Sequence, residues 1–323
     1  MNILVENPIL QTQIFAIIFF ITIIFSIRKK KDKSFFSIAT TTEMKGFAML
    51  AIVLSHIGYF LSIDTRFMFP LSILAGVGVD LFLFLSGYGL TVSALKKELK
   101  PIKFYLKRTS KIFVPLWIIL PIFVLMDFFI LHKSYPTVDI IQIFFGFVRE
   151  ADLLNNINSP IWFITLILFY YLIFPWFFKK EYPLLSALLM FLIGYFFVTF
   201  GFEIIWRVNH LHKLHIMAFP LGIAFAGLYH SPNLIKKWPE KIMAKLSTKP
   251  WILNTVKILL TILALVVFLY FSVHSGMDTS PWIQQNISNL TMFALVVLFL
   301  VKPFDIKLFT FIGLFSYEMY IIH

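Results

Sequence analysis

The sequence has six ionisable side chains inside apolar stretches, where such groups are rare and are usually functional, and three of them could act together. Lys45 and His56 are eleven residues apart, and eleven helical steps end about 20° from the start, so one helix face would carry both. Asp80 follows in the next apolar block, at an expected depth similar to that of His56. A carboxylate beside a histidine fixes its tautomer and raises its basicity, as a general base requires. A buried pair that only ties two helices together would use the same residue types.

A second group of charged residues occupies the segment 96–111, which holds seven Lys and Arg residues. Lys107, Arg108 and Lys111 stand at positions i, i+1 and i+4, so a helix would present them together. Such a cluster could bind a polyphosphate. Simple anchoring of a positively charged loop at the cytoplasmic face explains the same residues.

A third polar group contains Glu203, Arg207, His210, His212 and His215. The histidine spacing lacks a recognised zinc-ligand frame, so we expect no metal and interpret the group as a polar patch at the mouth of a cavity. The sequence has no cysteine, no P-loop and no GxSxG motif. These absences argue against a thiolate site, an ATPase and a serine hydrolase.

The elements that must position these groups follow from composition. Of the 323 residues, 59% are hydrophobic and 14% are charged, against about 25% charged in a typical soluble domain. The apolar residues form blocks long enough to cross ~30 Å of hydrocarbon. We therefore predict an all-α polytopic integral membrane protein with about ten transmembrane helices. The expected spans are 8–27, 43–62, 71–95, 112–131, 160–178, 184–200, 213–230, 251–272, 284–301 and 308–323.

The basic residues orient these spans. Alternate connections, beginning with 28–42, carry 21 of the 28 Lys and Arg residues, and the connections on the other side carry 5. Lysine and arginine gather on the cytoplasmic side, so the N-terminus is predicted to lie outside. The net charge of +12 then indicates lipid headgroups and anionic cytoplasmic ligands as partners, and no nucleic acid. Residues 1–42 are expected to form an extra N-terminal transmembrane helix and a basic cytoplasmic loop. The block 308–323 is short for a span, so a truncated last helix is expected.

Five segments of the sequence carry family-like motifs: 43–48 followed by His56, 78–88, 105–111, 159–164 and 315–323. In this order they resemble the acyltransferase-3 family of membrane O-acyltransferases. The resemblance covers 43–323, where the family's membrane domain is expected. Lysine replaces the more usual arginine of the family pattern at Lys45 and Lys111. Lysine keeps the charge and loses the bidentate fork of arginine.

The resemblance implies transfer of an acyl group, expected to be acetyl, from cytoplasmic acyl-CoA to a hydroxyl of a cell-envelope carbohydrate. Acetyl-CoA would be a donor substrate, with no permanently bound cofactor. The implied roles are His56 as general base with Asp80 and Lys45, and Lys107, Arg108 and Lys111 on the CoA phosphates. The implied acceptor-side residues are Glu203, Arg207, His210 and Trp162, and the other core positions are Ser86, Tyr317 and Glu318.

Two alternatives stay open at this point. A covalent acyl group on His56 could relay the transfer. A transporter or flippase of a lipid-linked sugar would also suit ten helices around a His–Asp pair, although no repeat relates the two halves of the chain. The expected location is the plasma membrane of a bacterium, with membrane lipid, acyl-CoA and a carbohydrate acceptor as partners. The identity of the acceptor and the oligomeric state are not readable from the sequence.

Overall fold

The computed structural model describes the greater part of the chain, and all that follows concerns those residues. The described ranges are 5–30, 32, 36–57, 67–69, 71–148, 150–151, 157–201, 207–230, 250–275 and 280–323.

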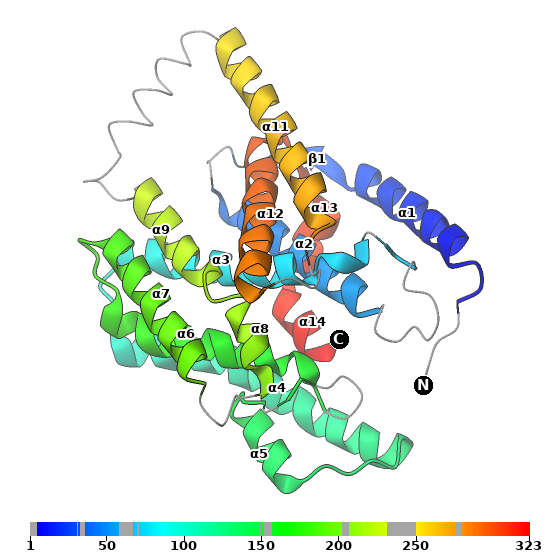
Figure 1. The fold of residues 1–323 in the computed structure, drawn as a ribbon, viewed down its shortest axis with the longest axis vertical. Helices are drawn as coiled ribbons and strands as arrows, with labels where there is room; N and C mark the ends of the chain where they lie inside the picture. Colours follow the sequence, from blue (N-terminus) through cyan, green and yellow to red (C-terminus); the bar gives the residue numbers. More distant parts are fainter. Residues whose placement is uncertain are drawn as a thin grey trace. The chain divides into compact units, whose positions relative to one another are not determined.

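Helices dominate the described chain, with one pair of three-residue strands (Figure 1). The elements are α1 (Pro8–Phe25), β1 (Ile27–Lys29), α2 (Ile38–Ile57), η2 (Leu71–Ile73), α3 (Ala75–Lys96), α4 (Pro101–Ile130), α5 (Thr137–Phe144), η3 (Ser159–Ile161), α6 (Trp162–Phe177), α7 (Pro183–Phe200), α8 (Asn209–Lys213), α9 (Ala218–His230), α11 (Pro250–Ser272), α12 (Pro281–Val301), β2 (Phe304–Ile306), α13 (Lys307–Leu314) and α14 (Ser316–Ile322).

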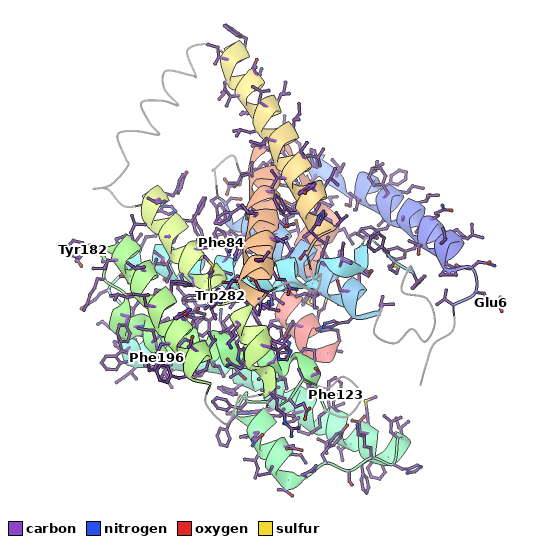
Figure 2. The ribbon with its side chains drawn as sticks, in the orientation of Figure 1. Glu6, Phe84, Phe123, Tyr182, Phe196 and Trp282 are labelled. Atoms are coloured by element: carbon purple, nitrogen blue, oxygen red, sulfur yellow. The ribbon has the colours of Figure 1, made fainter. Side chains whose placement is uncertain are left out.

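Nine helical stretches within the described ranges are long and apolar enough to cross a membrane. These helices also carry apolar side chains on their exposed surfaces. In the apolar helix α1, for example, no residue is buried. On α7 and just before it, Phe196 and Tyr182 are 53% and 64% exposed and project away from the ribbon (Figure 2). Large apolar side chains in such positions are suited to contact with lipid. The protein is therefore an all-α, multi-pass membrane protein, as predicted.

Local chemistry explains where several helices begin and end. Ser37 caps α2, since its hydroxyl accepts a hydrogen bond from the backbone N–H of Thr40 at 3.0 Å. Pro101 and Pro183 occupy first-turn positions of α4 and α7, where a missing N–H costs nothing. Gly201 ends α7 with a φ of 56°, a left-handed conformation that glycine adopts without strain.

The chain divides into two compact units. Unit 1 comprises 1–85 and 235–316 and contains α1, α2, α11, α12, α13 and the first part of α3. In this unit α2 packs closely on α13, because Gly46 and Gly313 let backbone meet backbone. A Cβ at Gly46 would lie 1.8 Å from the Phe309 carbonyl oxygen, and one at Gly313 would lie 1.8 Å from that of Thr42. Strands β1 and β2 pair antiparallel, and α11 lies beside α12 (Figure 1).

Unit 2 comprises 86–234 and 317–323 and contains α4 to α9 with the second part of α3. Its core is aromatic: the Tyr170 ring stacks on Phe219 at 4.5 Å, and the Tyr170 hydroxyl donates to the carbonyl of Ile216. Gly87 allows α3 to approach α9, since a Cβ there would lie 2.2 Å from the carbonyl oxygen of Phe219. Small residues at such crossings are typical of helices in membranes.

Two expected boundaries are wrong. The segment 96–111 was expected to be a loop before a span at 112–131, whereas α4 begins at Pro101 and runs for 30 residues. The segment 308–323 was expected to be one helix, whereas α13 and α14 are separate short helices that break at Phe315. The connection after α4 contains the eight-residue helix α5, which is too short to span a membrane.

Candidate active site

The first candidate residues lie on the single unbroken helix α2 in unit 1. Lys45 and His56 are both half-buried, and about 16 Å of helix rise separates them. His56 lies one turn beyond Ile52, whose side chain contacts α3: a Cβ at Gly78 would lie 2.9 Å from Ile52 Cγ1. His56 is therefore on the face that α2 turns toward α3.

Asp80 on α3 is completely buried. The hydroxyl of Ser288 on α12 donates a hydrogen bond to Asp80 Oδ2. A hydrogen bond from a neutral donor to a buried carboxylate offsets part of the cost of removing the charge from water. The pairing of Asp80 with His56 stays a prediction, and the structure adds Ser288 as a residue that sequence reasoning missed.

Ser288 belongs to a polar row on one face of α12. Gln285, Ser288, Asn289 and Thr291 are all at most 5% exposed, in a helix otherwise suited to lipid. The Asn289 side-chain amide donates to the carbonyl of Gln285 at 2.8 Å. Buried polar side chains in a membrane helix face the interior of the bundle, and they commonly hold helices together or line a site.

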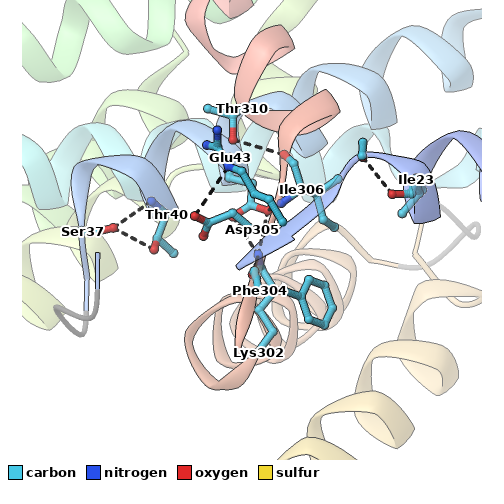
Figure 3. A network of polar contacts seen from close by, with 11 residues as sticks. Ile23, Ser37, Thr40, Glu43, Lys302, Phe304, Asp305, Ile306 and Thr310 are labelled. Carbon is cyan, nitrogen blue, oxygen red and sulfur yellow. Dashed lines mark hydrogen bonds and ion pairs between the residues drawn. The ribbon is translucent and has the colours of Figure 1, made fainter. Parts of the chain in front are cut away.

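A buried ion pair stabilises the start of the helix that carries Lys45 (Figure 3). Both carboxylate oxygens of Glu43, which is 1% exposed, lie 2.7 Å from Lys302 Nζ. The backbone N–H of Ile306 donates to the same carboxylate, and Lys302 also donates to the carbonyl of Phe304 at 2.6 Å. The network joins α2 to the β2 segment in unit 1, so it constrains the position of α2 two residues before Lys45.

In unit 2, a basic hollow of about 310 Å³ surrounds the junction of α3 and α4. Five cationic side chains and one carboxylate line it, together with the aromatic ring of Phe104. Lys107 and Arg108 belong to this lining, and Lys111 does not. Lys111 lies one turn further along α4, where its side chain is exposed outside the hollow. The structure therefore brings together two of the three expected phosphate ligands. The charged lining residues are Lys97, Glu98, Lys100, Lys103, Lys107 and Arg108.

Arg108 also contacts the interior of unit 2. Its guanidinium carbon lies 5.7 Å from the centroid of the Tyr171 ring, within the range of a cation–π contact. The Tyr171 hydroxyl is hydrogen-bonded to Ser86 Oγ at 2.8 Å. Tyr171 was not anticipated from the sequence, and it links Ser86 to the basic hollow.

The other two expected core positions, Tyr317 and Glu318, differ in burial. Tyr317 is half-buried on α14 and donates a hydrogen bond to the carbonyl of Ile112 on α4 at 2.7 Å. Glu318, its neighbour, is exposed, so the expected core position of this carboxylate is wrong. The short helix α14 turns adjacent residues to different sides, and Glu318 is on the outer one.

The expected acceptor-side residues make separate contacts in the described structure, and their grouping stays a prediction. Arg207 forms an ion pair with Glu150, at 2.5 Å between Nη1 and Oε2. Trp162 stacks on His215 with ring centroids 5.4 Å apart. His210 is exposed, and Glu203 lies outside the described residues.

Comparison with family models assigns the chain to a family. A model described as an acyltransferase domain matches residues 44–323. The chain belongs to the acyltransferase-3 family. Comparisons with curated proteins and with solved structures found no match. The acyltransferase-3 match covers both units, beginning within α2 and including the basic hollow. The protein is thus a membrane acyltransferase, which favours the enzymatic interpretation over the transporter.

Proposed function

We propose that this acyltransferase moves an acetyl group from cytoplasmic acetyl-CoA to a hydroxyl of a cell-envelope carbohydrate, in the plasma membrane of a bacterium, with His56 as general base. The basic hollow at the junction of α3 and α4 is the observation that supports this donor most strongly. Its cationic excess is larger than membrane anchoring of a helix end requires.

The charges of the hollow match a phosphate-rich ligand. Five cations against the single carboxylate of Glu98 leave four positive charges around about 310 Å³. Arg108 can present a planar fork to a phosphate, and Lys107 adds a point charge one residue away. The lysine distribution predicts that this end of α4 is cytoplasmic, which is the compartment that contains CoA.

The proposed reaction needs one proton carrier. The acceptor hydroxyl gives its proton to His56 as its oxygen attacks the thioester carbonyl. A C–O bond forms, the C–S bond then breaks, and the departing CoA sulfur takes the proton back from the imidazolium. His56 is therefore unchanged after each turnover, and no redox partner is needed.

Asp80, Ser288 and Lys45 have supporting roles in this proposal. Asp80 stabilises the transient imidazolium charge, and the Ser288 hydrogen bond helps to hold the Asp80 carboxylate in position. Lys45 lies about 16 Å of helix rise from His56, too far to contact the reacting carbonyl, so in this proposal its positive charge faces the donor as the thioester passes toward His56.

The test is acetyl transfer by the purified full chain in liposomes, with radiolabelled acetyl-CoA and envelope glycans of the source cell. His56→Ala should lower kcat by at least about 100-fold, the usual contribution of a positioned general base. His274→Ala is the matched control, because His274 lies at the end of α11 and is bonded to the Tyr270 carbonyl at 2.7 Å. Wild-type turnover by His56→Ala would remove the central assignment.

A further inference from the structure

A second hollow in unit 2 has a different chemistry. It encloses about 260 Å³ around the loop after α4, the short helix α5 and Arg207, which lies just before α8. That volume is slightly below the usual range of small-molecule sites, about 300–1,000 Å³, so it can admit a single ring-sized group. Its polar lining residues are Tyr135, Asp139, Gln142, Glu150 and Arg207, and Phe147 adds an aromatic ring.

This hollow lies on the opposite side of the membrane from the basic one. Lys103 and Lys107 of the basic hollow are in the first turns of α4, whereas Tyr135 and Asp139 follow its last turn. A helix of 30 residues is about 45 Å long, and the hydrocarbon core is about 30 Å thick. With the basic end in the cytoplasm, the second hollow faces outside.

The charges of this outer hollow nearly balance. Arg207 is paired with the carboxylate of Glu150, and Asp139 adds one negative charge. At its edge, the Tyr135 hydroxyl donates to Asp127, and Lys133 Nζ lies 5.0 Å from the Tyr135 ring centroid. Burial and this hydrogen bond raise the pKa of Tyr135 above its ordinary value, so the phenol stays protonated. Among the described residues, three carboxylates against two cations give no net attraction for a polyanion.

The polar groups of the hollow both donate and accept hydrogen bonds. Asp139 and Glu150 accept, Arg207 donates, and Gln142 and Tyr135 do both. A sugar hydroxyl also does both, so a neutral sugar can satisfy such a lining, and the ring of Phe147 offers it an apolar face.

We propose that this outer hollow is a subsite for a neutral sugar residue of the acceptor carbohydrate. The inference rests on the proposed function for its biological role, and its ligand chemistry is testable separately. It places acceptor recognition on α5 and on residues that the sequence did not single out, with Arg207 as the shared member.

The experiment measures binding of soluble oligosaccharides to the full chain in lipid nanodiscs by saturation-transfer NMR. The probes are maltotetraose and chitotetraose, which are neutral, and poly(glycerol phosphate), which is anionic. Asp139→Asn with Gln142→Ala should weaken binding of the neutral probes about tenfold, because two hydrogen-bonding groups are altered. Gln142→Trp fills the hollow without changing a charge and should also weaken binding. Thr137→Ala, an exposed change on the same helix, should bind as wild type does.

The outcomes separate this inference from the proposed function. Acetyl-CoA hydrolysis without acceptor should be the same in all these variants, because the donor hollow is untouched. Failure of the wild type to bind either neutral probe, equal binding by the variants, or a preference for poly(glycerol phosphate) would overturn the subsite. If the wild type does not turn over acetyl-CoA, the proposed function is refuted, whatever the sugar-binding result.

Discussion

Replacing Lys302 by methionine is expected to destabilise the protein strongly, because it leaves the Glu43 carboxylate buried without its counter-ion. Glu43 is 1% exposed and would keep only the hydrogen bond from the backbone of Ile306. Removing one partner of such a pair costs about 3–5 kcal/mol, since the remaining charge stays out of water. Replacing both, as Glu43→Gln with Lys302→Met, removes the charges together, and the glutamine oxygen can still accept from Ile306. The double variant should therefore lie within about 1 kcal/mol of wild type.

The assay is thermal unfolding in detergent, followed by the fluorescence of the seven tryptophans. For a chain of this size, the single variant should lower Tm by roughly 5 °C or more, and the double variant should recover most of that loss. The two single variants and the double variant form a cycle, which should show a coupling of about 2 kcal/mol or more.

The matched control is Lys307→Met, the same substitution at an exposed lysine five residues away, which should leave Tm unchanged. Additive effects of the Glu43 and Lys302 changes, or equal Tm values for Lys302→Met and Lys307→Met, would refute the reasoning from burial.

Three further outcomes follow from the candidate site. Lys107→Gln should raise the KM for acetyl-CoA about fivefold, since one charge at 4 Å in water is worth about 1 kcal/mol, whereas Lys111→Gln should leave it unchanged. Unchanged KM values for both variants would indicate that both lysines only anchor the helix at the membrane, and equal increases would contradict the assignment of Lys107 without Lys111 to the hollow. Ser288→Ala should lower kcat without changing the KM for acetyl-CoA, because it removes the hydroxyl that donates a hydrogen bond to Asp80. Ser288→Thr keeps a hydroxyl and should restore most of kcat. An unchanged kcat in Ser288→Ala would show that Ser288 has no positioning role. Gly313→Ala should lower Tm by several degrees in the same fluorescence assay, because its Cβ would lie 1.8 Å from a backbone oxygen of α2, and an unchanged Tm would contradict that close packing.

The membrane spans could be predicted because they depend on local composition. The block expected at 251–272 is almost the same as the helix Pro250–Ser272, and the block expected at 8–27 contains Pro8–Phe25. The start of α4 was missed because its first turns are polar and basic, which resembles a loop when hydropathy alone is considered. Pro101 at the first helical position was a signal that could have placed it.

Within the candidate site, the sequence predicted which residues share a helix face better than it predicted which residues contact one another. The motif spacing placed Lys45 and His56 on one helix face, which depends only on helix periodicity. From the sequence, Lys302 was counted only as one of the basic residues that predict the orientation of the chain. In the structure it forms an ion pair with Glu43, 259 positions away. Nothing in the local pattern around either residue indicates that pairing.

The amino-acid sequence by itself determined the class of this protein, because hydrophobic length acts on each segment separately, and its charge asymmetry predicts the orientation of the spans and the depth of the ionisable groups. Only the tertiary structure decided that Ser288 contacts Asp80, that Lys107 and not Lys111 lines the basic hollow, and that α5 meets Arg207 in a second one. These contacts depend on which helix faces meet. Packing over long sequence separations sets that choice, and periodicity within one helix does not encode its partner.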